Sequence, residues 1–414
     1  MLPQNMGSET NIKLPFSFIL FSLIALVLSQ VLLLVNGQLM ATGSFRIPVI
    51  WSSAHLLVLG WALMAAMGAM YQLVPVAFLT NIWNEKFGFI QFFVTAVGIT
   101  SFSGMLYWSP QQAVIPGILT LLGILMFLFQ MFMTLKKQAK PTILTAFVGS
   151  ALICLLITIL LGITLIYSLK TGFAGEYYQS NFKAHLLMGL TGWFTLLIFG
   201  FSYKMVPMFS LSHGFPMVHA KYVLTFYVAG LIVSLISFFS NNSLLLKIGF
   251  FLLLLGFSIF SWHISIIIKK RLKKTLDKPF TFAIVSIGLA NVIHFVAFIL
   301  LWSNHFATLA GPLVYAYLLL WIVLSIVSYL YKIVPFLWWT FKYSKEIGKT
   351  KVPTLKEMMN EKIVPSLFTL FIGAILAVFF ALTFHITFLF NIGQSILSIA
   401  FIIIAISILR VLKK

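Results

Sequence analysis

Long apolar stretches separated by short polar segments dominate the chain. A hydrocarbon core about 30 Å thick is crossed by an α-helix of roughly 20 residues. Such a helix satisfies its own backbone hydrogen bonds, which lipid cannot do, so the pattern predicts an all-α membrane protein with about twelve transmembrane helices. The predicted spans are residues 15–36, 48–77, 87–108, 113–135, 142–169, 181–208, 220–239, 243–268, 279–302, 308–337, 363–383 and 387–411.

Composition agrees with this pattern, because 61% of the residues are hydrophobic and only 8% are charged. A soluble domain of 414 residues has too little interior to keep that much apolar surface out of water. We therefore expect residues 1–414 to form a single transmembrane domain in contact with the lipid bilayer. The one cysteine, Cys154, falls inside a predicted span and is expected to be a small buried residue.

The net charge of +20 is distributed unevenly over the loops. Of the 27 Lys and Arg, 23 lie in the N-terminal segment, in alternate loops or at the C-terminus. This asymmetry predicts that both termini are cytoplasmic, and a basic face beside anionic lipid accounts for the charge without a nucleic-acid site. The excess of lysine over arginine is typical of an AT-rich bacterial genome, so we expect the protein in a bacterial plasma membrane. The four basic residues on the opposite side are Arg46, Lys170, Lys183 and Lys247.

One fifteen-residue pattern occurs three times, with a Trp, a Tyr ten residues later and then Val-Pro. The copies are offset by 132 and 128 residues, which predicts three four-helix repeats, at approximately 15–135, 142–268 and 279–411. Because the repeats share one orientation, we expect a pseudo-threefold axis along the membrane normal. The copies are Trp61 to Pro75 (WALMAAMGAMYQLVP), Trp193 to Pro207 (WFTLLIFGFSYKMVP) and Trp321 to Pro335 (WIVLSIVSYLYKIVP).

Most of this motif has a structural explanation. The proline is expected to end each helix at the cytoplasmic interface, where its missing N–H costs least. The tyrosine, about one turn earlier, is expected at headgroup depth. A small residue seven positions after each Trp should allow close helix contact; these are Gly68, Gly200 and Ser328.

The acidic residues fall in loops or at span ends, and no predicted span has one near its middle. Ionisable residues inside a membrane usually mark function, so this distribution argues against the proton or cation relay of a coupled transporter and against carboxylate metal sites. The seven are Glu9, Glu85, Glu176, Asp277, Glu346, Glu357 and Glu361.

Histidine is distributed differently. His55 and His185 lie near the extracytoplasmic ends of repeat-equivalent spans, and His294 lies at comparable depth on the ninth span. A neutral imidazole at this depth can ligate a haem or a metal, or can hydrogen-bond to a backbone carbonyl. Within the repeat, His55 and His185 differ by two positions, or about 200° around a helix, so they are expected on opposite faces. Joint ligation of one group therefore stays open.

The stretch Ala54-His55-Leu-Leu-Val-Leu-Gly60-Trp61 resembles the second helix of subunit I in the haem–copper oxidase superfamily, including nitric oxide reductase large subunits. Ala184-His185-Leu-Leu-Met-Gly-Leu-Thr-Gly192-Trp193 is similar to it in the sixth span. The resemblance implies twelve spans in three four-helix arcs with both termini inside. It also implies that His55 occupies the position of an axial ligand to a low-spin haem.

Other positions depart from the family. The tenth span has no histidine, and Tyr315 stands where the repeat would place His55, as a candidate phenolate ligand or a packing residue. The seventh span lacks the family's copper-binding histidines, and His185 alone does not make a three-histidine site. These departures argue against copper, and against the turnover of an oxidase or nitric oxide reductase.

Two hypotheses follow, beside the disfavoured third one of active terminal oxidase or nitric oxide reductase chemistry, whose metal ligands the sequence lacks. The first is a haem-binding membrane protein with a role in electron transfer or in handling a diatomic gas such as NO or O2, with His55, His185, His294 and Tyr315 as candidate ligands. The second is a haem-free descendant of the same scaffold that serves as an assembly factor, a partner subunit or a small-solute transporter. In either case, redox or assembly proteins are the expected partners.

Overall fold

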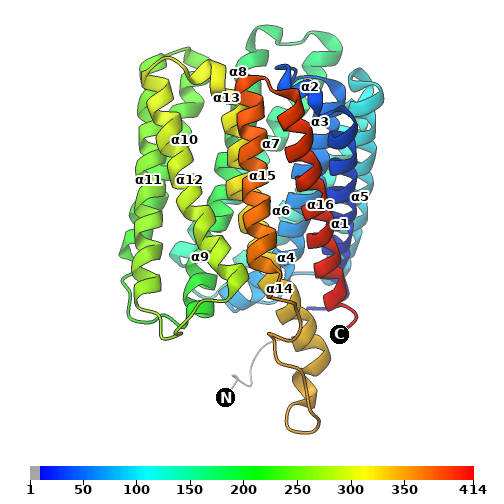
Figure 1. Cartoon of the computed structure of the whole chain (residues 1–414), viewed down its shortest axis with the longest axis vertical. Helices are drawn as coiled ribbons and strands as arrows, with labels where there is room; N and C mark the ends of the chain where they lie inside the picture. The colour runs from blue at the N-terminus through cyan, green and yellow to red at the C-terminus, as the bar shows by residue number, and fades with distance from the viewer. Residues whose placement is uncertain (1–9) are drawn as a thin grey trace.

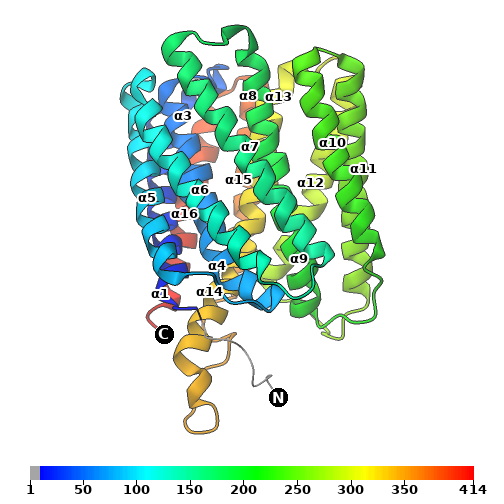
Figure 2. The same ribbon diagram turned by 180° about the vertical axis from the view of Figure 1, so that it is seen from behind.

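The computed structural model describes residues 10–414; residues 1–9, which include Glu9, lie outside it. Twelve helices in the described chain are long and apolar enough to cross a membrane. They run side by side along the long axis of the molecule, as Figures 1 and 2 show from opposite sides. No β-strand occurs in residues 10–414. The prediction of an all-α protein with twelve membrane-spanning helices is confirmed.

Nine of the twelve spans are single α-helices. They are α1 (Lys13–Asn36), α5 (Glu85–Trp108), α6 (Val114–Lys136), α7 (Ile143–Thr171), α10 (Val218–Ser240), α11 (Ser243–Lys269), α12 (Lys278–Trp302), α15 (Val364–Phe384) and α16 (Thr387–Val411). Short helical turns lie between spans. These are α2 (Gln38–Ala41), η2 (Pro110–Gln112), η3 (Gly175–Tyr177) and η6 (Ser344–Glu346).

The other three spans are composite, with a π-helical segment between two α-helices. Each π segment contains the repeat tryptophan, and its wider i→i+5 turns are often found at functional sites. The second span consists of α3 (Pro48–His55), η1 (Leu56–Leu63) and α4 (Met64–Phe78); the sixth of α8 (Tyr178–Leu186), η4 (Leu187–Phe194) and α9 (Thr195–Ser210); and the tenth of α13 (Phe306–Ala316), η5 (Tyr317–Val323) and α14 (Leu324–Tyr343).

These composite spans form the centre of the bundle. In their most apolar stretches 67, 83 and 83% of the residues are buried, against 28 to 50% in the other nine spans. Hydrogen bonds join the sixth span to the tenth, because the Thr195 and Tyr317 hydroxyls lie 2.6 Å apart and those of Ser202 and Tyr329 lie 2.7 Å apart. The three repeat tryptophans are almost fully buried here.

The described chain starts and finishes at the same end of the bundle. Helix α1 begins there and α16 ends there, and α14 extends beyond the bundle on that side (Figure 1). An even number of spans, here twelve, places the first and last helix ends on the same side. Which side of a membrane this end faces, and the relation of the three repeats about one axis, stay predictions.

The expected role of the motif proline is corrected by the structure. Helices α4, α9 and α14 continue past their prolines, since a proline removes only its own N–H bond and the following residues can still bond within the helix. In α4 and α9 the helix ends instead at a leucine with positive φ, Leu79 or Leu211. The motif tyrosines are buried against protein, and Tyr71 donates to Gln91 at 3.0 Å. Their depth relative to the headgroups stays a prediction.

The expectation for the small residues holds where glycine occupies the position. A Cβ added at Gly68 would lie 2.8 Å from the Pro15 carbonyl oxygen on α1. A Cβ at Gly200 would lie 3.0 Å from the Phe147 Cβ on α7. Both glycines therefore allow a neighbouring span to approach a central helix closely.

A cluster of charged side chains joins two loops to the tenth span at the end where the chain finishes. Asp277 accepts from Lys273 at 2.6 Å and also pairs with Lys332, which lies 3.4 Å from Glu361. Burial raises the pKa of Asp277, but hydrogen bonds and charge from Lys273 and Lys332 outweigh it and bring the pKa below its usual value. The carboxylate therefore favours the folded state above the unfolded pKa, and this contribution falls as pH drops through the lowered folded pKa.

We predict that Asp277→Asn destabilises the protein by about 2 kcal/mol at neutral pH, because it leaves Lys332 half-buried with only Glu361. The difference from the unmodified protein should shrink on acidification towards the pKa of Asp277. Thermal unfolding in detergent across a pH series measures both effects. The matched control is Glu176→Gln at an exposed loop position, which should change nothing. Equal stability of both variants at neutral pH would contradict the assignment.

Candidate functional site

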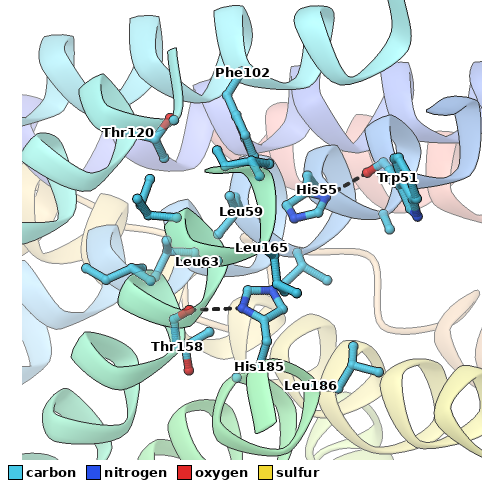
Figure 3. A pocket seen from close by; sticks show the side chains of 18 of the residues that line it. Trp51, His55, Leu59, Leu63, Phe102, Thr120, Thr158, Leu165, His185 and Leu186 are labelled. Atoms are coloured by element: carbon cyan, nitrogen blue, oxygen red, sulfur yellow. Dashed lines mark hydrogen bonds between the residues drawn. The ribbon is translucent and has the colours of Figure 1, made fainter. Parts of the chain in front are cut away.

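A cavity of about 270 Å³ lies between the second and sixth spans, and residues of α5, α6, α7 and the tenth span complete its wall. Small-molecule sites commonly have volumes of about 300–1,000 Å³, so this cavity is near their lower limit. Its wall consists mainly of leucine, isoleucine, phenylalanine and other apolar side chains, and contains no Asp, Glu, Lys or Arg. Figure 3 shows His55 and His185 facing each other across it.

The two imidazoles have matched geometry. Their ring centroids are 6.4 Å apart, and the ring planes are inclined by 28°. His55 Nδ1 lies 2.7 Å from the Trp51 carbonyl oxygen, and His185 Nδ1 lies 2.9 Å from that of Thr158. Because a carbonyl only accepts, Nδ1 carries the proton in each ring and Nε2 keeps its lone pair. Neither Nε2 has a hydrogen-bond partner within residues 10–414.

Repeat spacing placed these histidines on opposite faces of equivalent helices, and the tertiary structure explains how they meet. Helices α3 and α8 flank the cavity from different sides, so one face of α3 and the opposite face of α8 can both point into it (Figure 3). The two histidines, 130 residues apart in sequence, are thus brought into one site.

Helix α7 fixes the position of the His185 ring. Thr158 supplies the carbonyl acceptor, and one turn further along the helix Gly162 leaves space for the ring. A Cβ at Gly162 would lie only 3.1 Å from His185 Cε1. On the other side, Phe102 on α5 packs edge-on against His55 with ring centroids 5.3 Å apart. Each imidazole therefore has a hydrogen bond and a close packing contact that set its orientation.

His294, the third candidate ligand, lies outside this cavity. On α12 its Nδ1 is 2.8 Å from the Ala290 carbonyl oxygen, and its Nε2 is 3.4 Å from the Tyr227 hydroxyl. Tyr227 in turn lies 3.3 Å from the Tyr317 hydroxyl, which bonds to Thr195. His294 thus belongs to a buried polar network among the sixth, seventh, ninth and tenth spans.

Tyr315 is also separate from the two histidines. It is not part of the cavity wall, although its neighbour Val314 is. Its hydroxyl is buried without a hydrogen-bond partner in the described chain. The structure thus gathers His55 and His185 and places His294 and Tyr315 elsewhere.

Three residues that shape the site were not identified from the sequence. Thr158 and Gly162 act through backbone position and empty space, for which a lone polar or small residue in an apolar span is only a weak signal. Phe102 is one of 43 phenylalanines, and nothing in its sequence neighbourhood distinguishes it.

Comparison with known proteins identifies no relative: no protein-family model matches the chain, and no curated protein matches it.

We predict that replacing both His55 and His185 by leucine leaves the ligand-free protein within about 1 kcal/mol of its original stability. Each substitution removes an unpartnered nitrogen from an apolar cavity. The carbonyls of Trp51 and Thr158 still accept backbone hydrogen bonds within their own helices. Thermal unfolding of protein from haem-limited cells provides the measurement.

The matched control is His294→Leu, which takes a partner from a fully buried network and should cost about 1–3 kcal/mol. A double histidine variant less stable than this control would show that His55 and His185 hold the fold together.

Proposed function

We propose that this protein binds a haem through His55 and His185 and serves in electron transfer within a membrane, on a scaffold similar to subunit I of the haem–copper oxidases. The observation that carries the proposal is the pair of Nε2 atoms without partners on two imidazoles facing each other across an apolar cavity. Both Nε2 lone pairs are available to coordinate a metal ion.

The separation of the rings fits a shared metal atom. Bonds from imidazole nitrogen to metal are about 2 Å long, so one metal between two opposed rings puts their centroids roughly 6 Å apart. The observed 6.4 Å agrees with this arrangement. Hydrogen bonds from Nδ1 to carbonyl oxygens are the usual outer contacts of metal-binding histidines, since they fix the tautomer and raise the basicity of the ligand.

Two histidine ligands favour electron transfer over gas binding. If His55 and His185 both held a haem, the haem would supply one-electron redox chemistry rather than a binding site for O2 or NO. The apolar wall provides a low-dielectric surrounding, which disfavours the more highly charged state of the iron and so tunes its potential. In residues 10–414 no three His, Cys, Asp or Glu side chains lie together as a further metal site.

The size of the cavity sets one requirement. A tetrapyrrole occupies a larger volume than the cavity's 270 Å³ or so. Its binding therefore requires side chains of the wall to change rotamer. Leu59, Leu63, Leu165 and Leu186 border the histidines and are unbranched at Cβ, which leaves χ1 comparatively free (Figure 3).

We predict that the protein, purified from a haem-replete host, carries about one haem per chain with a low-spin spectrum. His55→Ala or His185→Ala should abolish binding or leave a high-spin haem, because one axial ligand is lost. His294→Ala should keep the original spectrum. Reduced-minus-oxidised spectra and haem assays give the result.

Carbon monoxide separates the two functional roles. The reduced protein should not respond to it, whereas a single-histidine variant that retains haem should. A response by the unmodified protein would favour gas handling. A colourless protein, with or without both histidines, would favour the haem-free alternative, in which the cavity takes a lipophilic solute.

We predict that Gly162→Val reduces haem occupancy about tenfold or more, since the new side chain must displace the His185 ring. Gly149→Val is the matched control on the same helix, because a Cβ there meets nothing within 4 Å. Both variants carry the same intrinsic helix cost, so only the contact with His185 distinguishes them. Equal occupancy in the two variants would argue against His185 as a ligand.

A further inference from the structure

Arg46 stands beside the cavity at the start of the second span, just before α3. Its guanidinium carbon lies 4.2 Å from the centroid of the Phe182 ring, and Phe182 is part of the cavity wall. One guanidinium nitrogen of Arg46 donates to Gln179 Oε1 at 2.8 Å. The cation is thus held between an aromatic face and an amide, both from α8, the helix that carries His185.

Arg46 has no ion-pair partner in residues 10–414. The ion pairs of residues 10–414 all belong to the cluster of Asp277, Lys332, Lys273 and Glu361. That cluster lies near the start of α12, whereas Arg46 precedes α3 at the opposite end of the bundle (Figure 1). Most N–H groups of the guanidinium therefore have no acceptor from the described chain.

The position of this cation also runs against the charge pattern of the chain. Only four of the 27 basic residues fall on this side of the predicted spans, and Arg46 is the single arginine among them. A planar guanidinium held by stacking is suited to bidentate recognition of a carboxylate, which a mobile lysine ammonium does not provide.

We propose that Arg46, positioned by Phe182 and Gln179, binds a carboxylate of the ligand in the two-histidine cavity. The site would then recognise an amphipathic anion, with its apolar body between the helices and its acid group at the arginine. This inference rests on the proposed function, in which the acid group is a propionate of haem. It makes Arg46 a determinant of ligand specificity and orientation.

The test compares two ligands that differ only in this group. Ligand-free protein in detergent is titrated with hemin and with hemin dimethyl ester, whose propionates are uncharged. Unmodified protein should bind hemin about tenfold more tightly than the ester. Arg46→Ala should lose this preference by weakening hemin binding alone, and Arg46→Lys should restore part of it.

A matched control comes from the same end of the bundle. Lys247 lies 4.7 Å from the centroid of the Trp302 ring, and neither residue is part of the cavity wall. Lys247→Ala should therefore leave the affinities for both ligands unchanged.

The outcomes separate this inference from the proposed function. If Arg46→Ala weakens hemin and its ester equally, or weakens neither, the carboxylate contact is wrong while haem binding stands. If the unmodified protein binds neither ligand, the proposed function fails and this inference fails with it. Unfolding temperatures of each variant show whether a loss of binding reflects a loss of fold.

Discussion

A polar group inside a bilayer must find its partner within the protein, because hydrocarbon offers none, and the centre of this structure is organised by that constraint. Thr195 and Ser202 hydrogen-bond to tyrosines of the tenth span, and Trp321 donates to Thr195 at 3.0 Å. These bonds hold the sixth and tenth spans together. Two imidazoles that face each other across an apolar cavity, with Nε2 unpartnered in residues 10–414, support a ligand site at this place.

The architecture of the site follows from the same packing. Helix α7 lies against the sixth span, where it provides both the carbonyl that orients His185 and the glycine that makes room for its ring. The second span brings His55 from the other side, and Phe102 on α5 limits its rotation. Rigid helices thus set the orientation of both imidazoles. Arg46, just outside α3, adds a charge where the apolar cavity has none.

Several local predictions from the sequence were correct and others were not. The apolar stretches gave the twelve spans, and Gly68 and Gly200 marked close helix contacts. The motif prolines did not end their helices, because α4, α9 and α14 each continue beyond them. The π segments were not foreseen at all, because a change from i→i+4 to i→i+5 bonding depends on packing around the tryptophans and leaves no periodicity to read.

A membrane span is marked by about twenty consecutive apolar residues, so the sequence by itself determined the helical class and the number of spans. It also placed histidines near one end of these spans. It also located the repeat that turned out to contain the buried tryptophans. Which histidines meet was decided only by the tertiary structure. The pairing of His55 with His185 depends on the relative rotation of two spans 130 residues apart, and that rotation is set by side-chain packing throughout the bundle rather than by any local spacing.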